Sequence, residues 1–363
     1  MSKTIHKLIK AVIISTNAFL AASIAMAERR EPDRVFNGHH APVAGIAGID
    51  AATSSRPSAL SVDTSGKVIL WDTATSDIAW EAQLGPTSAS GMVWVAPSPD
   101  GKSAVILRNH SPANIYNLQS GAVIQTLRVP DTATDERWIS GAFSSDSRRV
   151  VVMSMDRDIR LFDVETGLQT AAIEKPHAGE DERGGLVGFS KDGLFVTAFT
   201  NEAISIYDAT TLVVVKSLPI ASLGQLFYAR FSHDMRLIAL ATETDIFLIN
   251  TETLETMFKI KKPTEGYPHG LWTATMEFDA QSLNLRVLHI SMDGPFIGQY
   301  EIINTLSGIT TLTERINGEM FWPDDGTNEW FFATWLMPSS NILITGRGQS
   351  DRDSLAIWKL PTP

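Results

Sequence analysis

Short apolar runs, each followed by a few polar residues, repeat along most of the chain. Residues 68–84, VILWDTATSDIAWEAQL, show the pattern: an apolar run ends on a Trp-Asp pair, a polar turn follows, and a second half-apolar run begins. Short β-rich runs separated by Asp, Ser, Thr and Gly are typical of antiparallel strands and their turns. The stretch therefore predicts a β-hairpin whose first strand carries Trp71.

The same hairpin recurs, giving seven copies along the chain. The residues at the position of Trp71 are separated by 45, 46, 45, 42, 51 and 58 residues. A near-constant period of this size indicates a repeat architecture. In chain order we assign the position to Trp71, Tyr116, Phe162, Tyr207, Ile249, Tyr300 and Trp358.

A second pair of short runs precedes each hairpin. In three copies an apolar run reaches Phe143, Phe189 or Phe231, a Ser-x-Asp turn follows, and another β-rich run begins. The copy before Tyr116 has Pro97 at the Phe position. Each unit therefore carries four strands, and units of roughly 40–45 residues with four strands predict β-propeller blades. We expect an all-β, seven-bladed propeller of four-stranded antiparallel blades.

The two ends of the repeat region complement each other. The last copy, SLAIWKLPTP, stops after its third strand, whereas a spare strand, Arg34–Phe36, precedes the first copy. The sequence predicts that this strand completes the last blade and closes the ring, which removes an exposed sheet edge. Residues 34–363 would then form a single domain, preceded by a short segment, 28–33.

The first 27 residues have the pattern of a secretory signal peptide. Lys3, Lys7 and Lys10 precede an apolar stretch over 11–24, and Ala25-Met26-Ala27 is a small-x-small cleavage pattern. The alternative is a membrane anchor, but the apolar stretch is short for a span of about 20 residues. We expect cleavage after Ala27, export without a membrane anchor, and a periplasmic or secreted location.

Composition narrows the classes of partner. The chain has no Cys, so an exported form is held without disulfides, which suits a bacterial periplasm. Its formal charge is −11, and loss of the three signal lysines makes it −14. Such a chain repels nucleic acid at long range and could attract a basic partner, although ordinary solubility also explains the charge.

At this point the chain resembles a divergent WD40-repeat protein of an exported bacterial type. Gly38-His39 and Trp71-Asp72 stand in the order of that family's Gly-His and Trp-Asp pairs, and Asp156 precedes Phe162 by six residues, as the family's turn Asp usually precedes its Trp. The resemblance implies a propeller that acts mostly as a non-catalytic platform for protein partners. It also implies structural repeat roles for His39, Trp71, Asp72, Asp156, Phe162, Tyr207 and Trp358.

This resemblance is incomplete, and a second one is weaker. Only the first copy has both pairs, so the family's hydrogen-bond network between His, Asp, Ser or Thr, and Trp is expected to be largely absent. Asp72, Thr75 and Trp80 also partly match the repeat of quinoprotein dehydrogenases, but the docking Trp of that repeat occurs once here. We therefore expect no cofactor.

The sequence carries no catalytic or metal-binding motif that we recognise. It has no Gly-x-Ser-x-Gly elbow, no P-loop, no dinucleotide fingerprint and no His-x-x-x-His spacing. The segment DDGTNE has only part of the spacing of a calcium loop. We expect no catalytic residue and no bound metal, although residues scattered in the sequence could still converge around a propeller axis.

One feature does point to binding: four predicted connections between blades are rich in aromatic and charged residues. Loops on a rigid scaffold commonly carry function, and Trp, Tyr and Arg are frequent anchors of interfaces. Alternatively, Trp138, Trp272 and Trp330 begin inner strands and pack between blades, and the acidic loops are merely solvated. The candidate binding residues are Arg137, Trp138, His177, Arg183, Tyr267, His269, Trp272, Trp322, Asp324, Asp325 and Trp330.

These observations favour a non-catalytic periplasmic propeller that binds a protein or peptide, or that acts as a scaffold subunit. The alternative is an exported propeller enzyme, a hydrolase, lactonase or redox subunit, with a site at the central channel. The sequence leaves open the identity of the partner, the oligomeric state and the face of the propeller that binds, because fold alone does not imply function.

Overall fold

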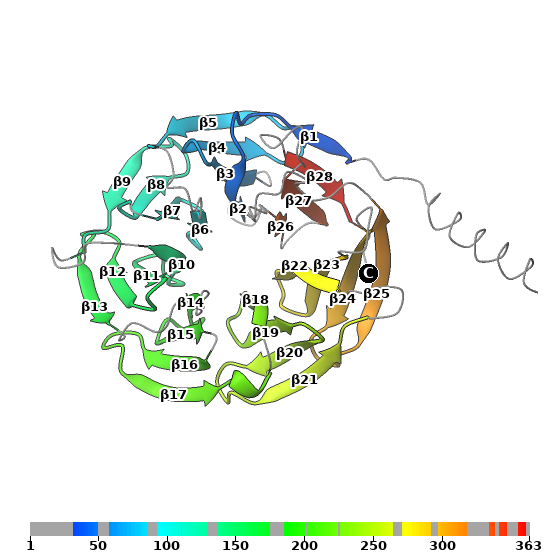
Figure 1. The fold of residues 1–363 in the computed structure, drawn as a ribbon. Helices are drawn as coiled ribbons and strands as arrows, with labels where there is room; N and C mark the ends of the chain where they lie inside the picture. The colour runs from blue at the N-terminus through cyan, green and yellow to red at the C-terminus, as the bar shows by residue number, and fades with distance from the viewer. Residues whose placement is uncertain are drawn as a thin grey trace, which may run out of the picture.

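A computed structural model describes thirteen stretches of the chain: residues 32–49, 58–85, 93–109, 111–129, 137–174, 185–200, 202–223, 226–263, 271–291, 297–317, 334–337, 341–346 and 355–360. These residues form seven four-stranded antiparallel sheets arranged in a ring around a central axis (Figure 1). The predicted all-β, seven-bladed propeller is confirmed. Among the described residues, no helix is long and apolar enough to cross a membrane.

Each blade has an inner, a second, a third and an outer strand, counted from the centre of the ring. The inner strands are β2 (Val43–Ile49), β6 (Val93–Pro97), β10 (Trp138–Phe143), β14 (Gly185–Phe189), β18 (Leu226–Phe231), β22 (Leu271–Phe278) and β26 (Thr334–Leu336). The second strands are β3 (Ser58–Asp63), β7 (Ser103–Arg108), β11 (Arg149–Ser154), β15 (Phe195–Thr200), β19 (Leu237–Thr242), β23 (Asn284–Ser291) and β27 (Ile342–Gly346).

The third and outer strands form the hairpins that the sequence repeats. The third strands are β4 (Lys67–Asp72), β8 (Asn114–Asn117), β12 (Ile159–Asp163), β16 (Ala203–Asp208), β20 (Asp245–Asn250), β24 (Ile297–Asn304) and β28 (Leu355–Lys359). The outer strands are β5 (Ile78–Gln83), β9 (Val123–Thr126), β13 (Gln169–Ile173), β17 (Val214–Pro219), β21 (Thr256–Lys261), β25 (Thr310–Asn317) and β1 (Arg34–Phe36), and a 3-10 turn (Ala221–Leu223) follows β17.

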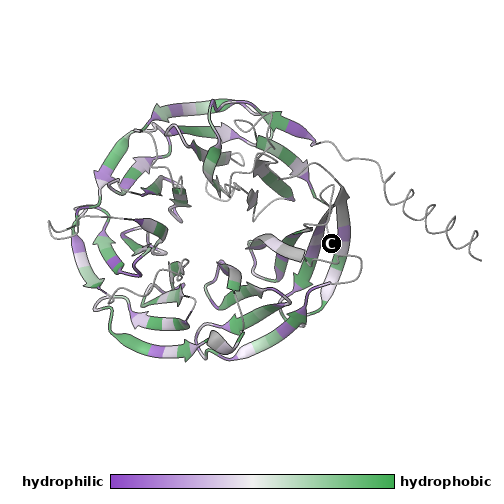
Figure 2. Ribbon diagram, viewed as in Figure 1, coloured by the Kyte–Doolittle hydropathy of each residue, from purple (hydrophilic) through white to green (hydrophobic). Residues whose placement is uncertain are grey.

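Burial differs systematically between the middle and the outer strands. All six residues of β19 are buried, because neighbouring blades cover both faces of a middle strand. In β5 and β21, exposed residues alternate with half-buried ones towards the end of the strand. Figure 2 shows the same contrast as mixed hydropathy along the outer rim. The hydrophobic core therefore lies between blades rather than at the centre of the ring.

The ring closes as the sequence predicts. β1 pairs with β28 in antiparallel register, with Arg34 opposite Ile357 and Phe36 opposite Leu355. The Phe36 ring then stacks on the Trp71 indole of the first blade, with centroids 4.2 Å apart and planes 8° apart. The closing strand thus completes blade 7 by hydrogen bonds and joins it to blade 1 by an aromatic contact.

The turn between the third and outer strands is built the same way in six blades among the described residues. A side-chain oxygen at the end of the third strand accepts hydrogen bonds from backbone N–H groups two and three residues later, which forms an Asx turn. For Asp72 these donors are Ala74 and Thr75, at 2.7 and 3.0 Å. The equivalent residues are Asn117, Asp163, Asp208, Asn250 and Asn304.

These turns correct the repeat assignment in blade 6. The residue before Asn304 is Ile303, and the register shift between Ile302 and Ile303 matches the shift between Leu70 and Trp71 in blade 1. Ile303, rather than Tyr300, therefore occupies the repeat position. The error arose because the strands of blade 6 are eight residues long, so a nearby aromatic residue stood at a plausible spacing.

The expected repeat residues at this position are buried. Trp71, Phe162, Tyr207 and Trp358 lie in the core of the third strands. The Trp358 Nε1–H donates to Thr345 Oγ1 at 3.0 Å, so blade 7 has one bond of the His, Asp, Ser or Thr, and Trp network described above.

Blade 1 holds the complete network. The Trp71 Nε1–H donates to Ser61 Oγ at 3.0 Å, Ser61 Oγ lies 2.7 Å from His39 Nε2, and His39 Nδ1 lies 3.0 Å from Asp63 Oδ2. The acid that pairs with His39 stands eight residues before Trp71, not six as assumed from the repeat. The six-residue spacing points instead to Ser65, which donates its hydroxyl to Asp63 Oδ1 at 2.6 Å, so the rule missed the acid at the end of β3.

Asp156, placed by the six-residue rule, has a different partner. Its Oδ1 accepts a hydrogen bond from Arg137 Nη2 at 2.9 Å, and both side chains are partly exposed. In blade 3 an exposed ion pair thus stands near the position of the buried His-Asp pair of blade 1. Exposed pairs of this kind contribute little to stability, typically about 0–1 kcal/mol.

Neighbouring blades are joined by outer-strand side chains that reach the next turn. The Trp80 Nε1–H donates to the Leu118 carbonyl at 2.7 Å, and Gln125 Nε2 donates to the Glu165 carbonyl at 2.7 Å. Gly121, at φ +71°, lies beneath the Trp80 ring, where a Cβ would be 2.7 Å from Cε3. Glycine is therefore required both by the backbone conformation and by the close approach.

The buried network of blade 1 predicts a pH-dependent contribution to stability. Burial opposes ionisation of Asp63, but hydrogen bonds from His39, Ser65 and the Lys67 N–H lower its pKa below the ordinary value of 3.8. A lowered pKa stabilises the fold above the unfolded-state value, and this contribution is lost as the pH falls through the folded-state pKa. We expect Asp63→Asn to lower the free energy of unfolding by about 1.5–3 kcal/mol at neutral pH.

Urea unfolding at pH 7 and below pH 3.8 tests this expectation, with the exposed Asp77→Asn in the same blade as the control. The deficit of Asp63→Asn should shrink at the lower pH. An equal deficit at both pH values would show that the charge of Asp63 does not act as described.

Candidate ligand site in the central channel

The inner strands enclose a cavity of about 610 Å³ along the axis of the ring. Its lining includes the second halves of these strands and the turns that follow them, so the cavity lies toward the face that carries the turns between inner and second strands. We call this face the inner-turn face and the opposite one, where the blades are connected, the connection face. Inner strands of all seven blades contribute lining residues: Ile49, Trp94, Ala142, Val187, Phe231, Glu277 and Trp335.

Local sequence explains why the inner-turn face is well ordered. In four blades the Ser of the Ser-x-Asp turn donates its hydroxyl to the Asp, and the distances for Ser144–Asp146 and Ser190–Asp192 are 2.5 and 2.6 Å. The residue that ends the inner strand, Phe143, Phe189 or Phe231, immediately precedes this turn and lines the cavity. The repeated turns therefore hold aromatic side chains at fixed positions around the channel.

The walls are mainly aromatic and aliphatic, with few polar groups. The Trp94 indole is fixed by a hydrogen bond from Nε1 to the Gly141 carbonyl of the next inner strand, at 2.8 Å. Trp335, from β26, has its Nε1 buried with no hydrogen-bond partner among the described residues. Pockets with largely apolar walls and a few fixed polar groups are typical ligand sites.

The main polar group of the channel is an ion pair between neighbouring blades. Arg230 on β18 donates to Glu277 Oε2 on β22 through Nε at 2.8 Å and also through Nη2. The side chains are 14% and 3% exposed. Burial by itself would lower the pKa of Arg230, but the Glu277 carboxylate reverses this effect and raises it, so the guanidinium stays charged.

Two further groups complete the site. The Arg230 guanidinium carbon lies 4.3 Å from the centroid of the Trp335 ring, which is cation–π geometry. His233 Nε2 lies 3.5 Å from the other oxygen of Glu277, and the His233 side chain is partly exposed at the mouth. The arrangement presents a fixed cation, an aromatic wall and a partly exposed His, and it suits binding of a side chain or a small ligand.

A second polar cluster lies inside blade 6. His289 Nε2 is 3.3 Å from Glu301 Oε2, and Thr273 Oγ1 is 3.3 Å from His289 Nδ1. Burial lowers the pKa of His289 despite Glu301, and burial lowers the pKa of Lys262, which precedes this blade, to about 8. These side chains are buried, so they offer no accessible site among the described residues.

No group of three or more potential metal ligands occurs among the described residues. Most of the candidate binding residues of the sequence analysis lie outside those residues: His177, Arg183, Tyr267, His269, Trp322, Asp324, Asp325 and Trp330. For Trp272 only the backbone, in β22, is described. The binding roles of these nine residues therefore stay predictions.

Two candidates are described, and neither lies in the cavity. Arg137 pairs with Asp156 at the start of β10. Trp138 is 2% exposed and packs in the core between blades 2 and 3, with Val105 and Leu127 among its neighbours. The packing alternative thus describes Trp138 better than an exposed anchor.

Sequence reasoning missed Arg230 and Glu277. They are 47 residues apart in adjacent blades, and each follows the alternating pattern of an ordinary strand. The available signal was a charged residue just before the Phe that ends the inner strand, a position where the other repeats have Ala142 and Gly188.

No family model matches the sequence, and no curated protein sequence matches it. Among solved structures, the crystal structure of the β-propeller domain of Cps50 (Swd1) from Myceliophteria thermophila is similar, with a TM-score of 0.66 and 12% sequence identity. The match covers 90% of this chain and 100% of that domain. At this identity the likeness shows the propeller fold.

The burial of Trp138 predicts a structural rather than a binding defect. Trp138→Ala should lower the free energy of unfolding by about 3–5 kcal/mol, because it removes a large core side chain. Chemical denaturation followed by circular dichroism measures the change. An unchanged free energy of unfolding would contradict a core role for Trp138 and would favour its interpretation as a surface anchor.

The buried Arg230–Glu277 ion pair predicts that removing one partner lowers stability more than replacing both. Glu277→Gln leaves the Arg230 charge without its partner and should lower the free energy of unfolding by about 3–5 kcal/mol. The double variant Arg230→Met with Glu277→Leu should recover most of the loss, because apolar residues of similar size can replace a buried pair. The urea midpoints of the single and double variants measure both changes. An equal loss of stability in the two variants would contradict this prediction.

Proposed function

We propose that the chain is a non-catalytic platform that binds a protein or peptide partner, and that part of the partner enters the central channel from the inner-turn face. The observation that carries this proposal is the 610 Å³ cavity with apolar walls and a fixed Arg230–Glu277 pair in its wall. The size suits one or two side chains of a partner. Aromatic and Arg residues in a concave, largely desolvated site are typical interface hot spots.

The proposal also includes the location expected from the sequence. The amino-terminal pattern of residues 1–27 supports export to the periplasm, and the absence of Cys suits that compartment. The long connections rich in aromatic residues support a second contact on the connection face, where Trp322 and His269 would contribute.

Blocking the channel mouth should abolish binding without unfolding the protein. Ala280 is an exposed residue of the turn after β22 and lines the cavity, so Ala280→Trp should obstruct the entrance. Ala74→Trp places the same side chain on an exposed turn of blade 1 away from the channel and serves as the matched control.

The measurement is an affinity capture from periplasmic extract with the wild-type mature chain and both variants, read by mass spectrometry. Proteins that are enriched by the wild type and by Ala74→Trp should be lost with Ala280→Trp. Equal recovery with all three chains would place the binding site elsewhere, and no enrichment over the support would contradict the platform function.

A further inference from the structure

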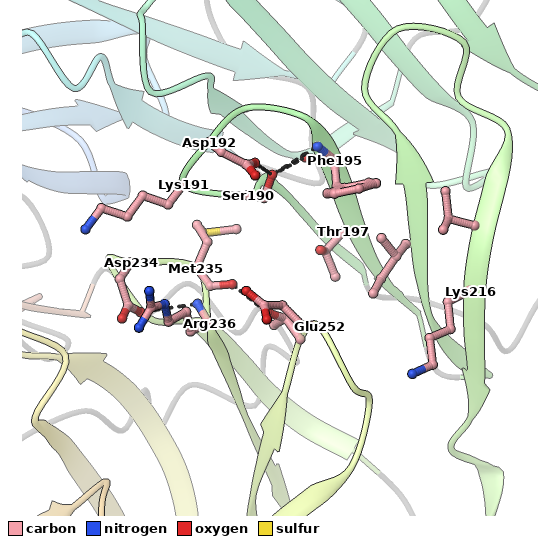
Figure 3. A pocket seen from close by; sticks show the side chains of 13 residues that line it. Ser190, Lys191, Asp192, Phe195, Thr197, Lys216, Asp234, Met235, Arg236 and Glu252 are labelled. Carbon is pink, nitrogen blue, oxygen red and sulfur yellow. Dashed lines mark hydrogen bonds between the residues drawn. The ribbon is translucent and has the colours of Figure 1, made fainter.

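A second cavity, of about 400 Å³, lies between blades 4 and 5 on the inner-turn face (Figure 3). Its apolar lining comes from second, third and outer strands of blade 4 and from the β18–β19 turn of blade 5: Phe195, Thr197, Ile206, Val215 and Met235. We call it the 4/5 groove. Its radial extent, from an inner-strand turn to the outer strand β17, distinguishes it from the axial channel.

The 4/5 groove is continuous with the channel cavity. Ser190, Lys191 and Met235 line both. A ligand in the channel could therefore extend past Lys191 and Met235 and run outward between the two blades. A continuous surface of this shape suits an extended chain better than a compact molecule.

Exposed aliphatic residues continue the surface at its outer end. Leu194, Val213, Val214 and Val215 are each more than half exposed, and they make up four of the twelve large apolar side chains that are exposed among the described residues. Leu194 and Val213 both lie beside the start of the β16–β17 turn. Their carbonyls accept hydrogen bonds from the N–H groups of Ala209 and Asp208, respectively. Clustered exposed apolar residues of this kind mark interaction sites.

Unused cationic hydrogen-bond donors on one side of the groove favour an acidic side chain of the partner. Lys191 and Arg236 project from the two turns on one side of the cavity and make no side-chain hydrogen bond or ion pair among the described residues, whereas Lys216 lies across from them on β17 (Figure 3). The carboxylates of the same two turns are occupied: Asp192 accepts from Ser190 and the Leu194 N–H, and Asp234 accepts from Ser232 and the Arg236 N–H.

The formal charges of the groove balance. Its lining holds three cationic side chains, Lys191, Lys216 and Arg236, and three carboxylates, Asp192, Asp234 and Glu252. The groove therefore favours an acidic side chain only locally, beside Lys191 and Arg236, where two cationic donors are unused in the described part of the chain. More distant exposed charges are screened over about 8–10 Å.

We propose that the 4/5 groove binds an extended segment of the partner protein, with an acidic side chain held between Lys191 and Arg236 and aliphatic side chains on Phe195, Ile206 and Val215. This inference rests on the proposed platform function and names the class of segment that it recognises. The segment would run outward from the channel mouth to the aliphatic surface of β17.

The test is a selection of short random peptides displayed on phage against the immobilised mature chain, followed by affinity measurements on synthetic copies of the selected peptides. Selected sequences should share an acidic residue next to aliphatic ones. Val215→Asp and Arg236→Glu should each weaken binding by about tenfold, as for anchors of an interface.

Matched controls come from the repeat itself. Val123→Asp changes an exposed valine at the start of the outer strand of blade 2, and Arg148→Glu changes the residue equivalent to Arg236 in the turn of blade 3. Neither should alter the affinity. Replacing the acidic residue of the peptide by Lys should abolish binding to the wild type.

Each other outcome overturns part of the scheme. Peptides that are insensitive to both groove variants but lost with Ala280→Trp would refute the groove and leave the platform function standing. Basic peptides, or a dimer of the mature chain that Val215→Asp dissociates, would also refute this occupant. Failure to select any peptide over the bare support would contradict the platform function itself.

Discussion

Each blade of this ring depends on its two neighbours to cover the apolar faces of its middle strands. A single four-stranded sheet would expose residues such as Val151 and Ile238, which are fully buried here. The ring satisfies this requirement for every blade only if the last gap is closed. β1 closes it through its ladder with β28 and through the stack of Phe36 on Trp71. The blades therefore depend on one another around the whole ring, and the three-residue strand β1 completes the burial between blades 7 and 1.

Repeated turn chemistry makes the rest of the scaffold nearly uniform. Asx turns end the third strands, and Ser-Asp hydrogen bonds brace the turns after four inner strands. Because these bonds are local, they fix the strand ends whichever side chains the strands present to the channel. Arg230 and Glu277 can therefore occupy positions that carry small residues in other blades without disturbing the fold. Function on such a scaffold is a matter of which side chains a few blades place at the axis and between the blades.

The buried polar groups of the chain serve two different purposes. Asp63 and His39 are buried and hydrogen-bonded to each other, so they hold blade 1 together. Arg230 is equally satisfied by Glu277, but it lies against Trp335 at the wall of an open cavity, and Lys191 and Arg236, beside the gap between blades 4 and 5, offer donors that no described residue uses. The net charge of the chain does not reveal such donors, because it is a sum without positions. The likeness to another β-propeller domain, at 12% identity, shows the fold only, so the recognition surface is inferred from the residues of this chain.

Local patterns in the sequence determined the architecture. The number of blades, their four strands, the Ser-Asp turns and the closing strand Arg34–Phe36 all follow from short-range alternation and turn residues, which act over a few neighbours. The tertiary structure alone decided features that depend on register or on distant blades. Eight-residue strands in blade 6 moved the repeat position from Tyr300 to Ile303, and the partner of His39 is Asp63 at the end of β3 rather than the residue at the six-residue spacing. Trp138 became core because blade 2 packs on it, and the Arg230–Glu277 site exists because ring geometry brings together side chains 47 residues apart.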